Sequence, residues 1–234
     1  MPDRDRPDVP AAAPPALRRF DGLADYLQTR DAMREFTRTR GTDTPDELWL
    51  LQHPPVFTLG LAGRDEHLMD PGDIPVVRTE RGGQITFHGP GQVIAYPLID
   101  LRRLGIGVKE LVFRIEQSII QAMAEFGLDG RRVAGAPGVY VPLPGGEGRF
   151  AGFAKIAALG IKISNGCSYH GLSLNVAMDL EPFERIDPCG YPGLRTVDFA
   201  RLGVAVDPEV VADRLGLRLQ AHLSPAARPQ GGLG

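Results

Sequence analysis

The sequence predicts an α/β protein of the α+β type, in which mixed β-sheets carry a few packed helices. Short apolar runs typical of strands fill its middle, and three longer segments have helical spacing of their apolar residues. The two kinds of segment do not alternate regularly, which argues against a doubly wound parallel sheet. With no linker or repeat visible, the 234 residues are predicted to hold one domain, residues 17–223, between disordered tails at 1–16 and 224–234.

The first half of this domain is predicted to begin with a helix and continue with strands. Rough helical spacing predicts a helix over about 21–40. Its apolar residues are Leu23, Leu27, Met33 and Phe36. The apolar runs 48–51 and 56–59 are separated by His53-Pro54-Pro55 and are expected to be two strands around a turn. Further strands are expected at 74–77, 84–88 and 93–99.

The second half is predicted to hold two helices around a group of strands. One apolar stripe indicates a helix that ends near Gly127. The stripe is made of Val108, Leu111, Val112, Ile115, Ile119, Met123 and Phe126. A last helix is expected to begin with Asp207 as its N-cap and Pro208 in its first turn. Its inner face is expected to be Val210, Val211, Leu215 and Leu219. Strands are expected between the helices at 139–141, 155–164 and 169–176, with a Pro/Gly loop at 142–148.

The composition excludes several classes of function. The net charge is −3 and the basic residues are scattered, so no nucleic acid is expected as a partner. No apolar run approaches about 18 residues, so no membrane association is expected. The two cysteines, Cys167 and Cys189, give neither a disulfide framework nor zinc-ligand spacing, so no metal site is expected. The start of the chain lacks the apolar stretch of a secretory signal, and a reducing cytoplasm is the expected location.

A glycine-rich segment, RGGQITFHGPGQ at 81–92, is the first candidate for a binding site. Its four glycines would let the backbone approach a ligand and would expose amide groups that bind an anion or a carbonyl oxygen. A β-hairpin turn with glycine bulges explains the same composition. The segment is neither a Walker loop nor a dinucleotide fingerprint, because the required spacings are absent.

Lys155 is the second candidate, because it lies in an otherwise apolar run. Burial in an apolar site lowers the pKa of a lysine and can make it a base. The alternative is a lysine on the wet side of a strand, with its stem lying over apolar neighbours.

Cys189, in Pro188-Cys189-Gly190, is the third candidate. A cysteine between proline and glycine is expected in a loop, where a nucleophile is accessible, although a lone loop cysteine is a weak signal. Cys167 has a histidine three residues later, His170. Residues three apart in a strand point to opposite faces, so the two are not expected to pair directly.

Together these segments resemble the octanoyltransferase family, also called lipoate-protein ligase B. The resemblance covers roughly residues 53–191 and depends on four blocks in this order. They are RGGQITFHGPGQVIAYPLIDL at 81–101, KIAALGIKI at 155–163, GCSYHGLSLNV at 166–176 and PCGY at 188–191, with HPPVFTLG before them. The loop at 142–152 is longer than in many members, which places the local geometry beside Lys155 in question.

The resemblance implies an acyltransferase with the fold shared by lipoate and biotin protein ligases. It implies transfer of an octanoyl group from octanoyl-acyl carrier protein to a lysine of lipoyl domains, in 2-oxoacid dehydrogenase complexes and the glycine cleavage H protein. It makes Cys189 the nucleophile, through an acyl-thioester intermediate, and Lys155 the base. The residues implied to contact substrate are Arg81, Gly82, Gly83, Gln84, Ile85, Thr86, Phe87, His88, Ala158, Leu159, Gly160, Gly171, Leu172 and Ser173. No cofactor is expected, and the chain is expected to act as a monomer.

Two other functions are compatible with this scaffold. An ATP-dependent lipoate or biotin protein ligase activates a free carboxylate as an adenylate, and Lys155 would then contact a phosphate while Cys189 would be incidental. A non-catalytic acyl- or cofactor-binding protein would need neither residue. The Pro-Cys-Gly block argues against the first alternative, and the presence of both Lys155 and Cys189 argues against the second.

Overall fold

The computed structural model describes residues 13–146, 148–187 and 194–225. Within them a seven-stranded sheet forms the centre of the molecule, in the order β1-β2-β6-β10-β9-β8-β7. Strand β1 pairs in parallel with β2 and the other neighbours are antiparallel. The strands are β1 Ala16–Leu23, β2 Glu47–Gln52, β6 Gln92–Leu98, β7 Arg131–Val133, β8 Ala136–Pro142, β9 Phe153–Ser164 and β10 Cys167–Asn175.

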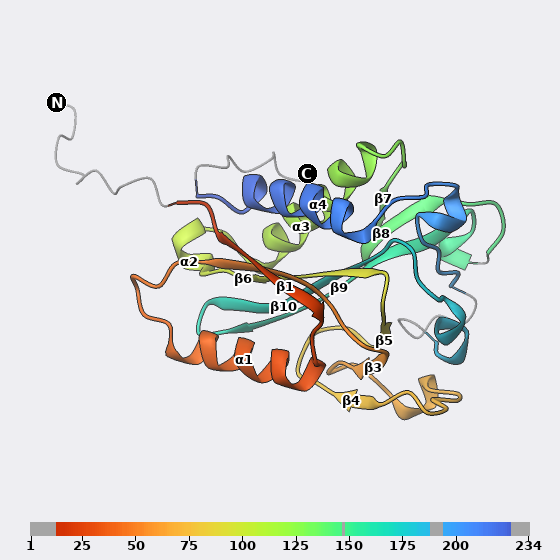
Figure 1. Ribbon diagram of the computed structural model, residues 1–234, viewed down its shortest axis with the longest axis horizontal. Helices are drawn as coiled ribbons and strands as arrows, with labels where there is room; N and C mark the ends of the chain where they lie inside the picture. Colours follow the sequence, from red (N-terminus) through yellow and green to blue (C-terminus); the bar gives the residue numbers. More distant parts are fainter. Residues whose placement is uncertain (1–12, 147, 188–193, 226–234) are drawn as a thin grey trace.

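A second sheet of three short strands lies at one end of the molecule (Figure 1). Strand β3 (Val56–Leu59) pairs in parallel with β4 (Val76–Arg78) on one side and antiparallel with β5 (Ile85–His88) on the other. Four α-helices accompany the two sheets in the described part of the chain, together with short 3-10 turns. They are α1 Tyr26–Thr39, α2 Leu101–Leu104, α3 Val108–Ala124 and α4 Pro208–His222. The predicted mixed α+β architecture is confirmed.

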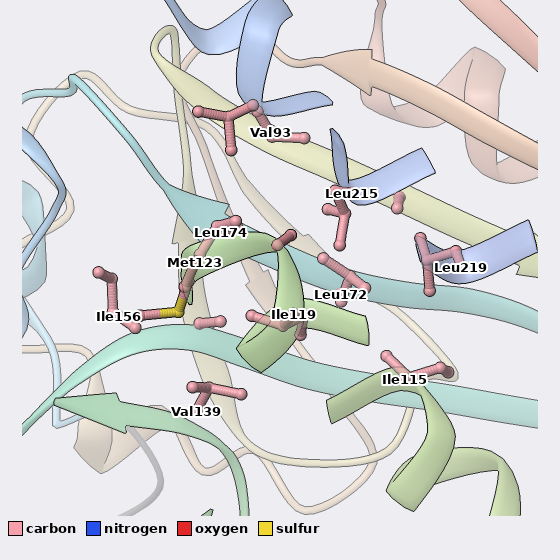
Figure 2. Close-up of a cluster of buried hydrophobic side chains, with 14 of the residues drawn as sticks. Val93, Ile115, Ile119, Met123, Val139, Ile156, Leu172, Leu174, Leu215 and Leu219 are labelled. Atoms are coloured by element: carbon pink, nitrogen blue, oxygen red, sulfur yellow. The ribbon is translucent and has the colours of Figure 1, made fainter. Parts of the chain in front are cut away.

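The large sheet is covered on both faces (Figure 1). Helices α3 and α4 pack on one face, where side chains such as Ile115, Ile119 and Leu215 are fully buried against the strands (Figure 2). Helix α1 packs on the other face through Met33, which lies in a separate cluster with Trp49. Burial of this kind stabilises the fold by roughly 25 cal/mol per Å² of apolar surface. The middle strands β6, β10 and β9 are therefore held rigidly between two layers.

The helix predicted over 21–40 starts later than expected. Its first residues belong to β1, which pairs with β2, and Asp25 is the N-cap of α1, its carboxylate accepting a hydrogen bond from the amide of Gln28 at 2.8 Å. Leu23 and Leu27 are exposed, so the prediction of an apolar face through them is wrong. Helical spacing extended the helix too far because it cannot detect a strand whose partner is remote in sequence.

Strands β2 and β3 are found on either side of residues 53–55, as expected, although they belong to different sheets. Two smaller corrections follow. The strand expected at 74–77 is found at Val76–Arg78. Val210 of α4 and Val108 of α3 are about half exposed, so the buried face of α4 is formed by Val211, Ala212, Leu215, Gly216 and Leu219.

The remaining helix signals were accurate. Asp207 caps α4 by accepting from the amide of Glu209 at 2.9 Å, and Gly127 adopts a positive φ just past α3. No helix in the described ranges is long and apolar enough to cross a membrane. The limits of the domain and of its two tails stay predictions.

Candidate active site

A pocket opens on the large sheet where it meets the glycine-rich segment. It is lined from β6, β10 and β9, from the first turn of α1, and from the loop and strand at 81–88, and it encloses about 580 Å³ including the solvent at its mouth. Lys155 lines it, and so do all the sequence-predicted substrate residues except Gly82 and Phe87. Three residues that the sequence did not single out as pocket residues join them, namely Tyr26, Tyr96 and His170.

Lys155 is buried in this pocket, with only 5% of its surface exposed. Its Nζ lies 3.4 Å from the carbonyl oxygen of Pro137 and 5.2 Å from the centroid of the Tyr140 ring. A Cβ at Gly138 would lie 3.1 Å from Lys155 Cε and 2.7 Å from the Ala157 carbonyl, so glycine is required beside the lysine stem. The alternative of a lysine on the wet side of a strand is therefore wrong.

The segment that contains Cys189 lies outside the described residues. The distance between Cys189 and Lys155 is therefore not part of the description. The described chain on either side of it is anchored. Asp187 donates its amide to the carbonyl of His67 at 2.9 Å, and Thr196 pairs with Lys155 as an isolated parallel bridge. The amide of Lys155 donates to the Arg195 carbonyl at 2.8 Å, so the chain that follows 188–193 runs along β9 at the lysine.

Arg81 holds the glycine-rich loop in place. Its buried guanidinium donates to the carbonyl of Thr58 at 2.6 Å and to that of Gln84 at 2.8 Å, which ties the loop to β3. A Cβ at Gly160 would lie 2.8 Å from the carbonyl oxygen of Gly82, so the loop can lie against β9 only because this position is glycine. The amide of Gly82 donates to the Ile161 carbonyl at 3.0 Å, a contact that joins the loop to the large sheet.

The hairpin alternative for the glycine-rich segment is wrong. The first two glycines lie in the loop between β4 and β5, which both pair with β3 and not with each other. The last two lie between β5 and β6, which belong to different sheets. Phe87 points away from the pocket, because its ring packs 5.4 Å from Phe57 and 5.6 Å from Phe183 between centroids. Its neighbours Thr86 and His88, on the other side of β5, line the pocket.

Five buried rings gather at one end of the pocket, and we call them the ring cluster: Tyr26, His53, His88, Tyr96 and His170. Neighbouring rings lie with their centroids between 5.2 Å (Tyr26 and His53) and 6.2 Å (Tyr96 and His170) apart. His53 Nε2 lies 2.8 Å from the Tyr96 hydroxyl, and His88 Nδ1 lies 2.8 Å from Gln92 Oε1. Burial lowers the pKa of His53 to about 4 and that of His88 to about 3, so both are neutral near pH 7.

His170 and Cys167 do not act as a pair. His170 has a φ of 57°, and its Nε2 lies 3.4 Å from Thr79 Oγ1 and 3.8 Å from a carboxylate oxygen of Glu80. Burial lowers the pKa of His170, although Glu80 opposes this effect. Cys167 is buried beside Arg102 at 3.8 Å, and burial raises the pKa of its thiol. Within the described residues no group of three or more His, Cys, Asp or Glu side chains could hold a metal ion.

Comparisons with known proteins agree with this geometry. Residues 25–215 match the model of the lipoyl protein ligase A/B catalytic domain. An octanoyltransferase of Methylibium petroleiphilum is 61% identical over 220 residues, which cover 89% of this chain and 98% of that protein. A bipartite lipoate protein ligase from Thermoplasma acidophilum superimposes with a TM-score of 0.68 at 16% identity, over 91% of this chain and 84% of its own. Biotin protein ligase from Aquifex aeolicus follows with a TM-score of 0.52 at 11% identity, over 89% and 70% of the two chains. At these identities the two ligases show a shared fold.

Proposed function

The chain belongs to the octanoyltransferases, within the family of lipoyl protein ligase A/B catalytic domains, and we propose that it transfers an octanoyl group in protein lipoylation. The observation that carries the proposal is the 61% identity to an octanoyltransferase over nearly the whole of that protein. The predicted substrate residues support it, because all of them except Gly82 and Phe87 line one pocket that Lys155 also lines. The enzyme is thus an acyltransferase, and the proposed reaction uses no cofactor.

The donor in this proposal is octanoyl-acyl carrier protein, and the acceptor is a lysine on a lipoyl domain. The thiolate of Cys189 attacks the donor carbonyl, a new thioester bond forms, and the carrier leaves as a thiol that takes up a proton. The ε-amine of the acceptor lysine then attacks the acyl-enzyme. An amide forms, the thioester bond breaks, and Cys189 returns to its starting state. Covalent catalysis of this kind divides one difficult step into two easier ones.

Lys155 is proposed to manage the protons of both steps. A free cysteine with a pKa near 8.5 is mostly protonated at neutral pH, so a nearby base is needed to generate the thiolate. The same amine can relieve the acceptor lysine of a proton in the second step. Its position supports this role, because the side chain is buried at the pocket and its backbone pairs with the chain that follows the Cys189 segment.

The backbone of the pocket is suited to hold the acyl carbonyl. Gly83 adopts a φ of 83°, and with Gly160 it lines the pocket beside Gln84. Amide groups at such glycines can approach a carbonyl oxygen closely and stabilise the charge that develops on it.

The proposal is tested by intact-mass spectrometry after incubation with octanoyl-acyl carrier protein, without ATP or magnesium. We expect the wild type to gain one octanoyl group, which addition of a lipoyl domain then removes. Cys189→Ser should lose the thioester adduct, whereas the matched variant Cys167→Ser should keep it.

Two outcomes would overturn this assignment. A thioester on Cys167 in the Cys189→Ser variant would show that Cys167, and not Cys189, is the nucleophile. A strict requirement for ATP would instead place the protein with the ligases that share its fold. The cytoplasmic location, the individual lipoyl-domain acceptors and the monomeric state stay part of the proposal, and gel filtration with the carrier and acceptor proteins addresses the last two.

A further inference from the structure

The pocket has two chemically different ends. Lys155, on β9, lies at one end, and the ring cluster, with Tyr96 on β6 and Tyr26 at the start of α1, closes the other. Between them the surface of the pocket on the large sheet is formed by small residues such as Ala158, Gly160 and Gly171. A linear acyl group whose carbonyl is held near Lys155 would therefore run across these small residues toward the rings.

The pocket is long enough for an eight-carbon chain. Strand β10 separates β9 from β6, so the pocket crosses two strand spacings, or about 10 Å, across the sheet. Ala95, Leu172 and Leu159 lie level across these strands. Lys155 lies four residues further along β9, so the lysine side chain must span part of the way along the strand. An extended octanoyl group has seven C–C bonds of about 1.5 Å at tetrahedral angles and spans about 9 Å. The last carbon of such a chain would arrive near the ring cluster.

Among the rings, the hydroxyl of Tyr26 is unlike the other polar groups. His53 bonds Tyr96, and His88 bonds Gln92, so these groups are satisfied within the protein. Tyr26 is only 3% exposed, and its hydroxyl, which lies close to Thr79, has no partner in good hydrogen-bond geometry among the described residues. Buried hydroxyls in proteins are nearly always hydrogen-bonded, and an ordered water would satisfy this one. A chain long enough to touch it would displace that water and leave the hydroxyl unsatisfied.

We propose that Tyr26 limits the length of the acyl chain that the enzyme transfers. The tyrosine ring supplies a steric end to the pocket, and its hydroxyl makes the last position unfavourable for a methylene. Chains shorter than octanoyl lose about fourfold in affinity for each missing methylene, because less apolar surface is buried. Longer chains meet the hydroxyl. This inference deepens the proposed function and rests on it, because it takes an acyl thioester as the substrate.

The test compares hexanoyl, octanoyl, decanoyl and dodecanoyl donors in competition, with kcat/KM as the measurement. In the wild type octanoyl should be preferred. Tyr26→Phe removes only the hydroxyl and should raise the decanoyl-to-octanoyl ratio about tenfold, the effect of relieving one unsatisfied buried hydroxyl. Tyr26→Ala also removes the ring and should extend the preference to dodecanoyl.

The control is Tyr169→Phe, since Tyr169 is buried next to His170 in sequence but does not line the pocket. Its chain-length ratio should equal that of the wild type. Thermal melting confirms that each variant is folded, and Tyr26→Phe keeps the test valid if Tyr26→Ala does not fold.

The two proposals fail in different ways. A wild type that transfers octanoyl while both Tyr26 variants keep its chain-length ratios would overturn the limit but not the proposed function. A wild type that transfers no acyl thioester at all would overturn the proposed function.

Discussion

The two ends of the pocket bury polar side chains under different conditions. At one end Lys155 places an amine beside the Pro137 carbonyl and the face of Tyr140. At the other end His53 and His88 are kept neutral, because burial lowers their pKa values to about 4 and about 3. Both ends are almost completely buried. Burial of a polar group therefore does not by itself mark catalysis here.

The neighbours of each group make the distinction. Histidine is the commoner partner of a catalytic cysteine, and three histidines belong to the ring cluster. His53 and His88 use their ring nitrogens in fixed hydrogen bonds to protein groups, and His170 lies against Thr79 and Glu80. Lys155 instead lies where the chain following the Cys189 segment joins β9. We infer that the lysine end performs the chemistry and the ring end determines the fit.

The largest expected effect comes from removing the lysine amine. Lys155→Ala should lower kcat for octanoyl transfer by about a thousandfold or more, because Lys155 is the proposed base of both steps. Cys189→Ala should cost at least as much, and the double variant little more, since residues that act as a unit give non-additive losses. Lys155→Arg should also fail, because a guanidinium does not release its proton at neutral pH. Single-turnover transfer to a lipoyl domain is the measurement.

The matched control is Lys162→Ala, on the same strand but outside the pocket. It should keep near-normal rates. The assignment of the base would be wrong if Lys155→Arg retained activity while His170→Ala lost it, because the ring end would then perform the chemistry.

A smaller effect should appear at the neutral end, as a loss of stability in mild acid. His53 and His88 have folded-state pKa values below the ordinary value of about 6.5, so the unfolded chain binds more protons as pH falls. Their contribution is fully present above about pH 6.5 and is lost as pH falls toward about 4, at up to about 1.4 kcal/mol per pH unit for each histidine.

Urea unfolding at about pH 7, 6 and 5 measures this dependence through the free energy of unfolding. His53→Gln, which keeps hydrogen-bonding capacity without a titrating ring, should flatten it. An unfolding free energy that stays constant over this range in the wild type would show that the histidines can be protonated inside the folded pocket.

The sequence located the lysine end better than the ring end, and the reason is physical. Lys155 stands out because a single cation interrupts an apolar run, a signal contained in one segment. Tyr26, His53 and Tyr96 come from the start of α1, the chain after β2, and β6, and each alone is an ordinary aromatic or histidine. Only the fold brings them together, so local spacing could not identify them.

The same contrast applies to the fold. The long apolar stripe of α3, apart from its exposed first residue Val108, and the cap at Asp207 are local signals, and both were found as expected. Strand β1 forms by pairing with β2, which follows α1 in the chain. The three-stranded sheet forms because β3 pairs with β4 on one side and with β5 on the other. Such pairings depend on contacts between remote segments. Cys189 was singled out by its motif, and its proposed role depends on that motif and on the family.

The smallest expected effect concerns the ends of the chain, which were predicted to be disordered tails. Residues 13–225 include every described residue that lines the pocket, so deleting 1–12 and 226–234 should change neither the rate nor the chain-length preference by more than about twofold. A longer deletion through Pro15 is a useful comparison, because the Pro15 carbonyl accepts a hydrogen bond from Gln220 at 2.9 Å. Losing that contact should cost about 1 kcal/mol of stability and leave the kinetics unchanged. Steady-state rates with octanoyl and decanoyl donors, beside thermal melts, separate the effects. A large rate loss from the shorter deletion would show that one tail contributes to the site, and a shifted chain-length ratio alone would place that contribution at the ring end.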